Sequence, residues 1–158
     1  MLTALRNDID LQALLLAVPK PNTEQRTRDW LNRRLDDPQG VFFIICDRSS
    51  NRGVGFIQVV HIELLHRRGE LGLCIEPSEQ GKGYATAALG LIERYLQDVF
   101  DLRKLTLNVL ASNENAIGFY RGINYSTVGT LKQHFYYKQT FHDVLVMEKL
   151  FFAADVSR

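Results

Sequence analysis

The middle of the chain reads IEPSEQGKGYAT over residues 75–86. An alternating apolar run at residues 71–75 predicts a β-strand, and Pro77 ends it because proline has no backbone N–H to donate. Apolar residues at helical spacing from Ala85 to Val99 predict a helix directly after the glycines. A strand, a glycine turn and a helix leave free N–H groups and a positive dipole end at the helix N-terminus, which favours binding of a phosphate.

The turn contains two glycines separated by one residue. A side chain at Gly81 or Gly83 would keep a bulky pyrophosphate away from the N–H groups. The turn lacks the Gly-Lys-[Ser/Thr] ending of a Walker loop and the third glycine of a dinucleotide fingerprint. Residues 80–85 instead resemble the Q/R-x-x-G-x-G/A signature of the GNAT N-acetyltransferases, in which this turn wraps the pyrophosphate of acetyl-CoA. The alternative is a glycine-rich helix entry that binds no ligand.

Composition and charge are those of an ordinary globular protein. The 158 residues are 46% apolar and 23% charged, and 19 basic against 18 acidic side chains give a net charge of +1. We therefore expect a single domain, residues 1–158, without the basic field that would recruit nucleic acid or a membrane. No apolar run approaches a membrane span and no signal-peptide pattern is present, so we expect a cytoplasmic protein.

Cysteines and histidines give no sign of a metal site. Cys46 and Cys74 both lie in apolar strand-like runs, which predicts two reduced thiols in the core rather than a disulfide. A catalytic role for Cys74 has no histidine nearby in the sequence to activate the thiol. The four histidines lack metal-ligand spacing, so we expect no metal.

Hydrophobic periodicity predicts the order β-α-α-β-β-β-α-β-α-β-β. The expected strands are residues 2–5, 41–46, 54–65, 71–75, 104–110, 126–135 and 144–150. The helices outside the central motif are one with Leu11, Leu14 and Leu15 on one face, capped by Asn7 or Asp8 and ended by Pro19 and Pro21; one from Asn22 or Thr23 to Leu35; and one capped by Ser112 or Asn113. This order predicts an α/β (mixed α+β) fold with helices on both faces of a twisted sheet of six to seven strands.

A second motif, NENAIGFYRGINY at residues 113–125, strengthens the first. It resembles the N-x-x-A-i-x-l-Y-e-k-l-G-F segment that closes the cofactor site of GNAT proteins. Asn124 stands where that family has glycine, and asparagine is the usual non-glycine residue in the left-handed conformation that ends a helix. With two motifs in the family's order, residues 2–150 resemble a GNAT acetyltransferase with a mostly antiparallel sheet, most similar to the spermidine and ribosomal-protein (RimL-type) branch.

The resemblance implies a site for acetyl-CoA. Backbone groups of Leu73, Cys74 and Ile75 would pair with the pantetheine arm like an added strand. Asn113 matches the family asparagine that reaches the pantetheine, and its alternative role is to cap the following helix. The residues that would surround the pyrophosphate are Gln80, Gly81, Lys82, Gly83, Tyr84, Ala85 and Thr86.

Two residues are candidates for the chemistry, again on resemblance. Tyr120 occupies the position of the tyrosine that protonates the departing thiolate, and its alternative role is that of a buried core aromatic. Glu70 aligns with a glutamate that faces the substrate amine and can accept its proton, directly or through water. Alternatively, Glu70 is a strand-edge carboxylate paired with Arg67 or Arg68. Transfer in this family is direct, so proximity of the two bound substrates supplies much of the rate.

The expected function is therefore acetyl transfer from acetyl-CoA to a primary amine of a small molecule. Spermidine acetyltransferases carry an acidic stretch between their first helices, whereas residues 20–34 are net basic here. This charge favours an acceptor that bears negative charge, such as a nucleotide-linked amino sugar, over a polyamine. The alternatives are a protein N-terminal (RimL-like) acetyltransferase and a non-catalytic acyl-CoA-binding module. The oligomeric state stays open, a homodimer included.

Overall fold

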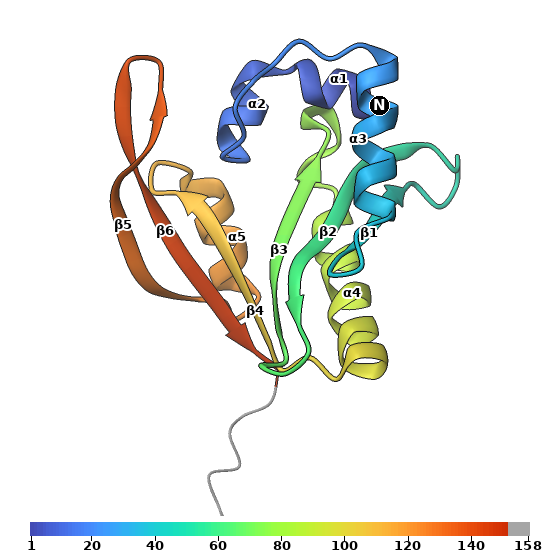
Figure 1. Ribbon diagram of the computed structural model, residues 1–158, viewed down its shortest axis with the longest axis vertical. Coiled ribbons are helices and arrows are strands. Elements are labelled where there is room, and N and C mark those ends of the chain that lie inside the picture. Colours follow the sequence, from blue (N-terminus) through green and yellow to red (C-terminus); the bar gives the residue numbers. More distant parts are fainter. Residues whose placement is uncertain (152–158) are drawn as a thin grey trace, which may run out of the picture.

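A six-stranded sheet forms the centre of the molecule (Figure 1). The computed structural model describes residues 1–151, so the last seven residues of the predicted domain lie outside the described residues. The strand order is β1-β2-β3-β4-β6-β5, and every neighbouring pair is antiparallel except β3 and β4, which are parallel. The strands are β1 (Val41–Cys46), β2 (Gly53–Glu63), β3 (Arg68–Ile75), β4 (Lys104–Leu110), β5 (Ser126–Tyr137) and β6 (Thr140–Leu150).

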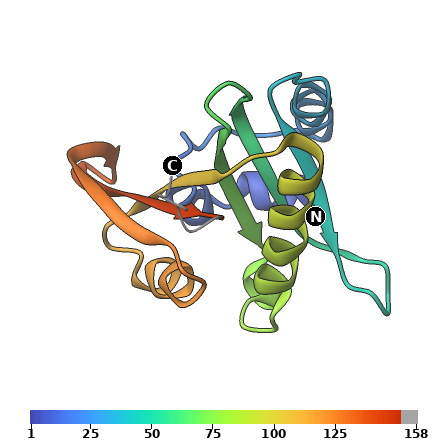
Figure 2. The same cartoon turned by 90° about the horizontal axis from the view of Figure 1, so that it is seen from below.

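Helices cover both faces of the sheet, as the sequence predicts (Figure 2). They are α1 (Leu2–Asn7), α2 (Ile9–Leu14), α3 (Glu24–Leu35), α4 (Tyr84–Phe100) and α5 (Glu114–Gly122), with a 3₁₀ turn at Pro77–Glu79. Alternation along the strands divides the core: Phe56 and Cys74 pack against α1 to α3, whereas their neighbours Ile57 and Ile75 pack against α4 and α5. None of the described helices is both long and apolar enough to cross a membrane.

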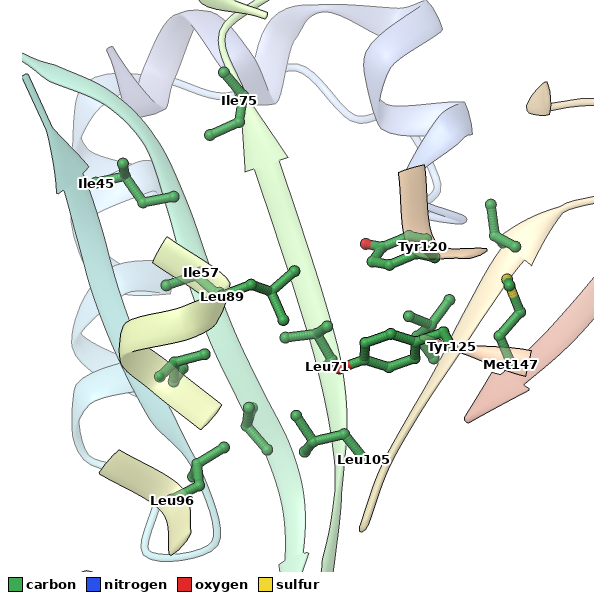
Figure 3. Packing of buried hydrophobic residues seen from close by; sticks show 14 of the residues in the cluster. Ile45, Ile57, Leu71, Ile75, Leu89, Leu96, Leu105, Tyr120, Tyr125 and Met147 are labelled. Atoms are coloured by element: carbon green, nitrogen blue, oxygen red, sulfur yellow. The ribbon is translucent and has the colours of Figure 1, made fainter. Parts of the chain in front are cut away.

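The larger core lies between α4, α5 and the sheet (Figure 3). Leu89, Ile92 and Leu96 recur at helical spacing on α4 and are almost completely buried. Leu105 of β4 and Met147 of β6 are fully buried on the same side. Burial of each such side chain stabilises the fold by roughly 1.5–3 kcal/mol, and together they attach α4 firmly to the sheet.

The N-terminal segment differs from the prediction. Residues 2–5 form helix α1 and not a strand, because Leu2 and Leu5 are three positions apart and a helix directs both into the smaller core. Helix α2 ends at Leu14, well before the two prolines that are expected to end it. Two residues later, Leu16 adopts a left-handed φ of 56°. The predicted strand at residues 54–65 ends at Glu63, because residues 64–67 form a turn.

Three predicted helix caps are confirmed. The Asp8 side chain caps α2, the Thr23 side chain caps α3, and the Asn113 side chain caps α5 by accepting a hydrogen bond from the Ala116 N–H at 3.2 Å. Asn124, which replaces the family glycine, has the expected left-handed φ of 71°.

The two cysteines differ in burial, which corrects the prediction of two core thiols. Cys46 is exposed, because it ends β1 where the register with β2 shifts. Cys74 is only 3% exposed. Its burial, with the nearby charge of Asp8, raises the pKa of the Cys74 thiol to about 12.

We therefore expect one fast-reacting thiol in the folded protein. Because the reactive species is the thiolate, Cys46 should react with a disulfide reagent and Cys74 should react only after unfolding in urea. Cys46→Ser should remove the fast phase and Cys74→Ser should leave it unchanged. Two fast thiols in the native protein would contradict the burial of Cys74.

Candidate active site

The parallel strands β3 and β4 separate after a short stretch of pairing. Only residues 68–70 of β3 pair with residues 104–106 of β4, and beyond that point the two strands diverge (Figure 1). On its other edge β3 stays paired with β2 as far as Ile75. The β4-facing backbone groups of residues 71–75 are consequently left without a strand partner. An extended chain can pair with such an edge.

A cavity of about 900 Å³ occupies this opening. Its walls come from β3, the first turn of α4, α5, α2 and the β5–β6 hairpin. The sequence-predicted site residues that line it are Glu70, Leu73, Cys74, Ile75, Gln80, Gly81, Gly83, Tyr84, Ala85, Thr86, Asn113 and Tyr120. Lys82 is the exception: its ammonium group lies outside and pairs with Glu79 at 3.0 Å.

The glycine turn depends on backbone conformations that favour glycine. Gly81 and Gly83 have φ values of +75° and +85°, which side-chain-bearing residues rarely adopt. A β-carbon at either position would meet no protein atom within 4 Å, so the protein itself does not crowd these sites. No side chain caps α4, and the N–H groups of residues 84–86 precede the first intrahelical hydrogen bond, from Ala87 to Gly83. These N–H groups are available to an anion in the cavity.

Asp47, in the turn between β1 and β2, holds the start of α4. The Tyr84 hydroxyl donates a hydrogen bond of 2.6 Å to its carboxylate, and the Ser49 and Ser50 hydroxyls donate two more. The hydrogen bonds, those from Ser49 and Tyr84 foremost, lower the pKa of Asp47. Sequence reasoning missed Asp47, because it lies 37 positions from Tyr84 and belongs to no motif.

Arg52 ties the loop before the glycines to the same hairpin. Its guanidinium group bonds Glu76 at 2.9 Å and Glu79 at 2.5 Å. Glu79 lines the cavity and also pairs with Lys82, so two cations neutralise this carboxylate. The glycine turn is therefore fixed at both its ends.

Tyr120 combines burial with an unpartnered hydroxyl. The residue is 8% exposed and packs against Phe119 and Tyr125, with ring centroids 5.2 and 5.5 Å away. Figure 3 shows its hydroxyl directed toward β3, and within residues 1–151 this hydroxyl has no hydrogen-bond partner. Burial, together with the nearby Cys74, raises the pKa of Tyr120, so its hydroxyl stays protonated. The cavity thus contains a neutral donor free to bond a ligand.

Glu70 lines the cavity at the point where β3 and β4 part. The alternative that it pairs with Arg67 or Arg68 is wrong: Arg67 bonds Asp101 at 2.6 Å and Arg68 bonds Glu63 at 2.8 Å. The Glu70 carboxylate contacts His61 instead, at 3.3 Å.

A hairpin and a helix close the far side of the cavity. On one side lie Leu11 and Leu14 of α2 and Leu15 directly after it, and on the other lie His134 and Phe135 of β5. Next to them the Tyr137 hydroxyl and the Lys138 ammonium bond the Asp10 carboxylate of α2, at 2.6 and 2.8 Å. Residues more than 120 positions apart thus meet here, which no local pattern indicates.

The basic segment does not belong to this cavity. None of residues 20–34 lines it, and α3 packs on the sheet through Trp30 and Leu31 in the smaller core. In the described chain, no lysine or arginine lines the cavity at all. This placement removes the reason for expecting an anionic acceptor. Among residues 1–151, no three His, Cys, Asp or Glu side chains come together in a way that could hold a metal ion.

Comparison with known proteins agrees with this geometry. The family model for the acetyltransferase (GNAT) domain matches residues 1–124. The chain is 35% identical to spermidine N(1)-acetyltransferase of Escherichia coli K12 over 112 residues, which are 71% of this chain and 59% of that protein. It is 26% identical to the Vibrio cholerae spermidine N(1)-acetyltransferase over 113 residues, 72% of this chain and 65% of that protein. The chain thus aligns with less than two thirds of the length of these relatives.

Solved structures share the fold. The crystal structure of spermidine N-acetyltransferase from Vibrio cholerae in complex with CoA and spermine superposes with a TM-score of 0.85 at 23% identity. The superposition covers 94% of this chain and 86% of that one.

Proposed function

The chain belongs to the GNAT family of acetyltransferases, and from this premise we propose that it transfers an acetyl group from acetyl-CoA to a primary amine of a polyamine. The observation that carries the proposal is one cavity that joins an unpaired strand edge, a glycine turn at a helix N-terminus and a protonated tyrosine. The names of the aligned relatives support the acceptor class. A cytoplasmic location, where acetyl-CoA is available, is part of the proposal.

Acetyl-CoA would lie along the inner wall of the cavity. The N–H groups at the start of α4 would bind its pyrophosphate, helped by the helix dipole. The pantetheine arm would extend beside Leu73, Cys74 and Ile75, where backbone groups that face away from β2, such as those of Leu73, can pair with its amides. The Ile75 carbonyl already accepts a hydrogen bond from the Gln80 side chain at 3.1 Å. Asn113 would contribute from the start of α5, because capping engages its side-chain oxygen and leaves the amide NH₂ group free to donate.

The chemistry needs a neutral amine, a stabilised oxyanion and a proton for sulfur. Glu70 would accept a proton from the acceptor's ammonium group, so that the nitrogen lone pair can attack the thioester carbonyl. A backbone N–H of β3 would bond the oxygen as charge develops on it. When the carbon–sulfur bond breaks, the thiolate would take the Tyr120 proton, and the proton that leaves the new amide nitrogen would restore the tyrosine through water. Glu70 would then release its proton to solvent.

The cavity suits a cationic acceptor with a hydrocarbon chain. It contains the Glu70 carboxylate and no lysine or arginine within the described residues. The leucines of α2 and Phe135 offer an apolar wall for methylene groups. A nucleotide-linked amino sugar would bring phosphates next to Glu70, and the repulsion between these like charges disfavours its binding.

We expect spermidine to release CoA thiol faster than any other amine class in a panel. The panel would contain spermidine, a uridine-diphosphate amino sugar and a peptide with a free N-terminus, each with acetyl-CoA and a thiol reagent. Added salt should raise the KM for spermidine, because salt screens the attraction between Glu70 and the amine. Preferential turnover of the amino sugar would contradict the acceptor assignment. Binding of acetyl-CoA without thiol release in the presence of any amine would favour a non-catalytic acyl-CoA-binding module.

A further inference from the structure

We propose that His61 is the positioning residue for Glu70 and holds this carboxylate toward the acceptor amine. The inference rests on the proposed function, since it assigns Glu70 to the amine. His61 Nδ1 lies 3.3 Å from Glu70 Oε2. Glu70 lines the cavity, whereas His61 lies outside it with three quarters of its side chain exposed. The imidazole would therefore contact the carboxylate from outside the cavity and would not touch the substrate.

An irregularity in β2 makes this contact possible. Val60 of β2 pairs with Glu70 of β3, so their side chains lie on the same face of the sheet. In a regular strand the next residue, His61, would direct its side chain to the opposite face. The register shifts between Val60 and Glu63, and His61 adopts a left-handed φ of 51°. A β-bulge of this kind changes the direction of a side chain. The backbone thus turns His61 onto the face that Glu70 occupies, at a conformation that most residues avoid.

The surrounding charges leave His61 as the partner of Glu70. The two nearest arginines in sequence are engaged elsewhere, Arg67 with Asp101 and Arg68 with Glu63. A guanidinium pair would compete with a cationic acceptor for the carboxylate, whereas an imidazole contact occupies one oxygen. Within the described chain the second oxygen, Oε1, has no hydrogen-bond partner. That oxygen is available to an amine in the cavity.

A double-mutant cycle tests the coupling. His61→Gly removes the imidazole and suits the left-handed backbone, while His61→Asn keeps a donor near the Nδ1 position and tolerates the same φ. We expect His61→Gly to raise the KM for spermidine about two- to fivefold, the size of effect usual for one exposed side-chain pair, with kcat little changed. The His61→Asn variant should have the wild-type KM for spermidine. In a Glu70→Gln background, His61→Gly should have no further effect, since partners in one pair are not additive.

His66→Asn serves as the matched control. His66 is a second exposed histidine of the same region, which contacts Glu63 at 3.8 Å and not Glu70, so its replacement should leave the KM unchanged. Additive effects of His61→Gly and Glu70→Gln, or an equal response to His66→Asn, would overturn the proposal.

A spectroscopic measurement separates this proposal from the proposed function. If the wild-type chain released no thiol with any amine, the proposed function would fail, but the contact itself could still be tested. The nitrogen chemical shift of His61 Nδ1 should change in Glu70→Gln and stay constant in Glu63→Gln. An unchanged shift in Glu70→Gln would show that the two side chains are not paired and would overturn the positioning role.

Discussion

Tyr120→Phe should slow acetyl transfer by roughly 10²-fold or more, the usual contribution of a positioned general acid. The substitution keeps the ring that packs between Phe119 and Tyr125 and removes only a hydroxyl that has no partner in the described residues. Stability and acetyl-CoA affinity should therefore be retained. Single-turnover kinetics with spermidine, thermal unfolding and calorimetry with acetyl-CoA would measure the three quantities separately.

Tyr125→Phe is the matched control. Tyr125 belongs to the same aromatic cluster, but its hydroxyl bonds Glu93 at 3.2 Å and it does not line the cavity. Its removal should affect stability rather than the rate of transfer. Full turnover by Tyr120→Phe would make Tyr120 a structural aromatic, and the thiolate's proton would then come from water or from the amine.

The expected pH dependence of the transfer rate follows from the raised pKa of Tyr120. Burial raises the pKa of Tyr120 above its usual value near 10, so the hydroxyl remains a donor throughout the neutral and mildly alkaline range. A loss of transfer below pH 10 should therefore not reflect ionisation of Tyr120. A fall in the transfer rate below pH 10 that is present in wild type and absent from the residual activity of Tyr120→Phe would contradict this.

Gly83→Val should weaken acetyl-CoA binding by about tenfold or more. At φ +85° a β-carbon costs about 1–2 kcal/mol, and a β-branched side chain more, so the turn would leave the conformation that presents the N–H groups. A loss of 1.4 kcal/mol corresponds to a tenfold change in affinity. Calorimetry would give the affinity, and circular dichroism would show whether the variant is folded. Unchanged affinity in a folded Gly83→Val protein would contradict the assignment of the turn.

Two further variants separate backbone strain in the turn from crowding of the pyrophosphate by a side chain. Gly83→Asn relieves the backbone strain yet still places a side chain beside the turn, so a loss of affinity there would come from crowding of the pyrophosphate. Gly90→Ala, in the interior of α4, adds a β-carbon that meets no atom within 4 Å. It should stabilise the helix by up to about 1 kcal/mol and leave the affinity for acetyl-CoA unchanged.

Local patterns in the sequence were sufficient for most of the architecture. The glycine turn, the apolar stripe of α4 and the cap at Asn113 each depend on residues within one or two turns of one another, so the chain itself reveals them. The fold class and the six strands within the predicted range follow from these elements and their order. The segment at residues 2–5 is predicted as the wrong type of element, because Leu2 and Leu5, three positions apart in so short a run, do not distinguish a helix from a strand.

Tertiary structure decided which residues share the cavity and which charges face it. The divergence of β3 from β4, the Asp47–Tyr84 hydrogen bond and the His61–Glu70 contact join segments that no local periodicity connects. The basic character of residues 20–34 was read correctly, but packing places α3 on the sheet away from the cavity. The sequence determines which side chains carry charge, whereas the face on which each helix is buried determines where that charge acts, because such burial depends on contacts distant in the chain.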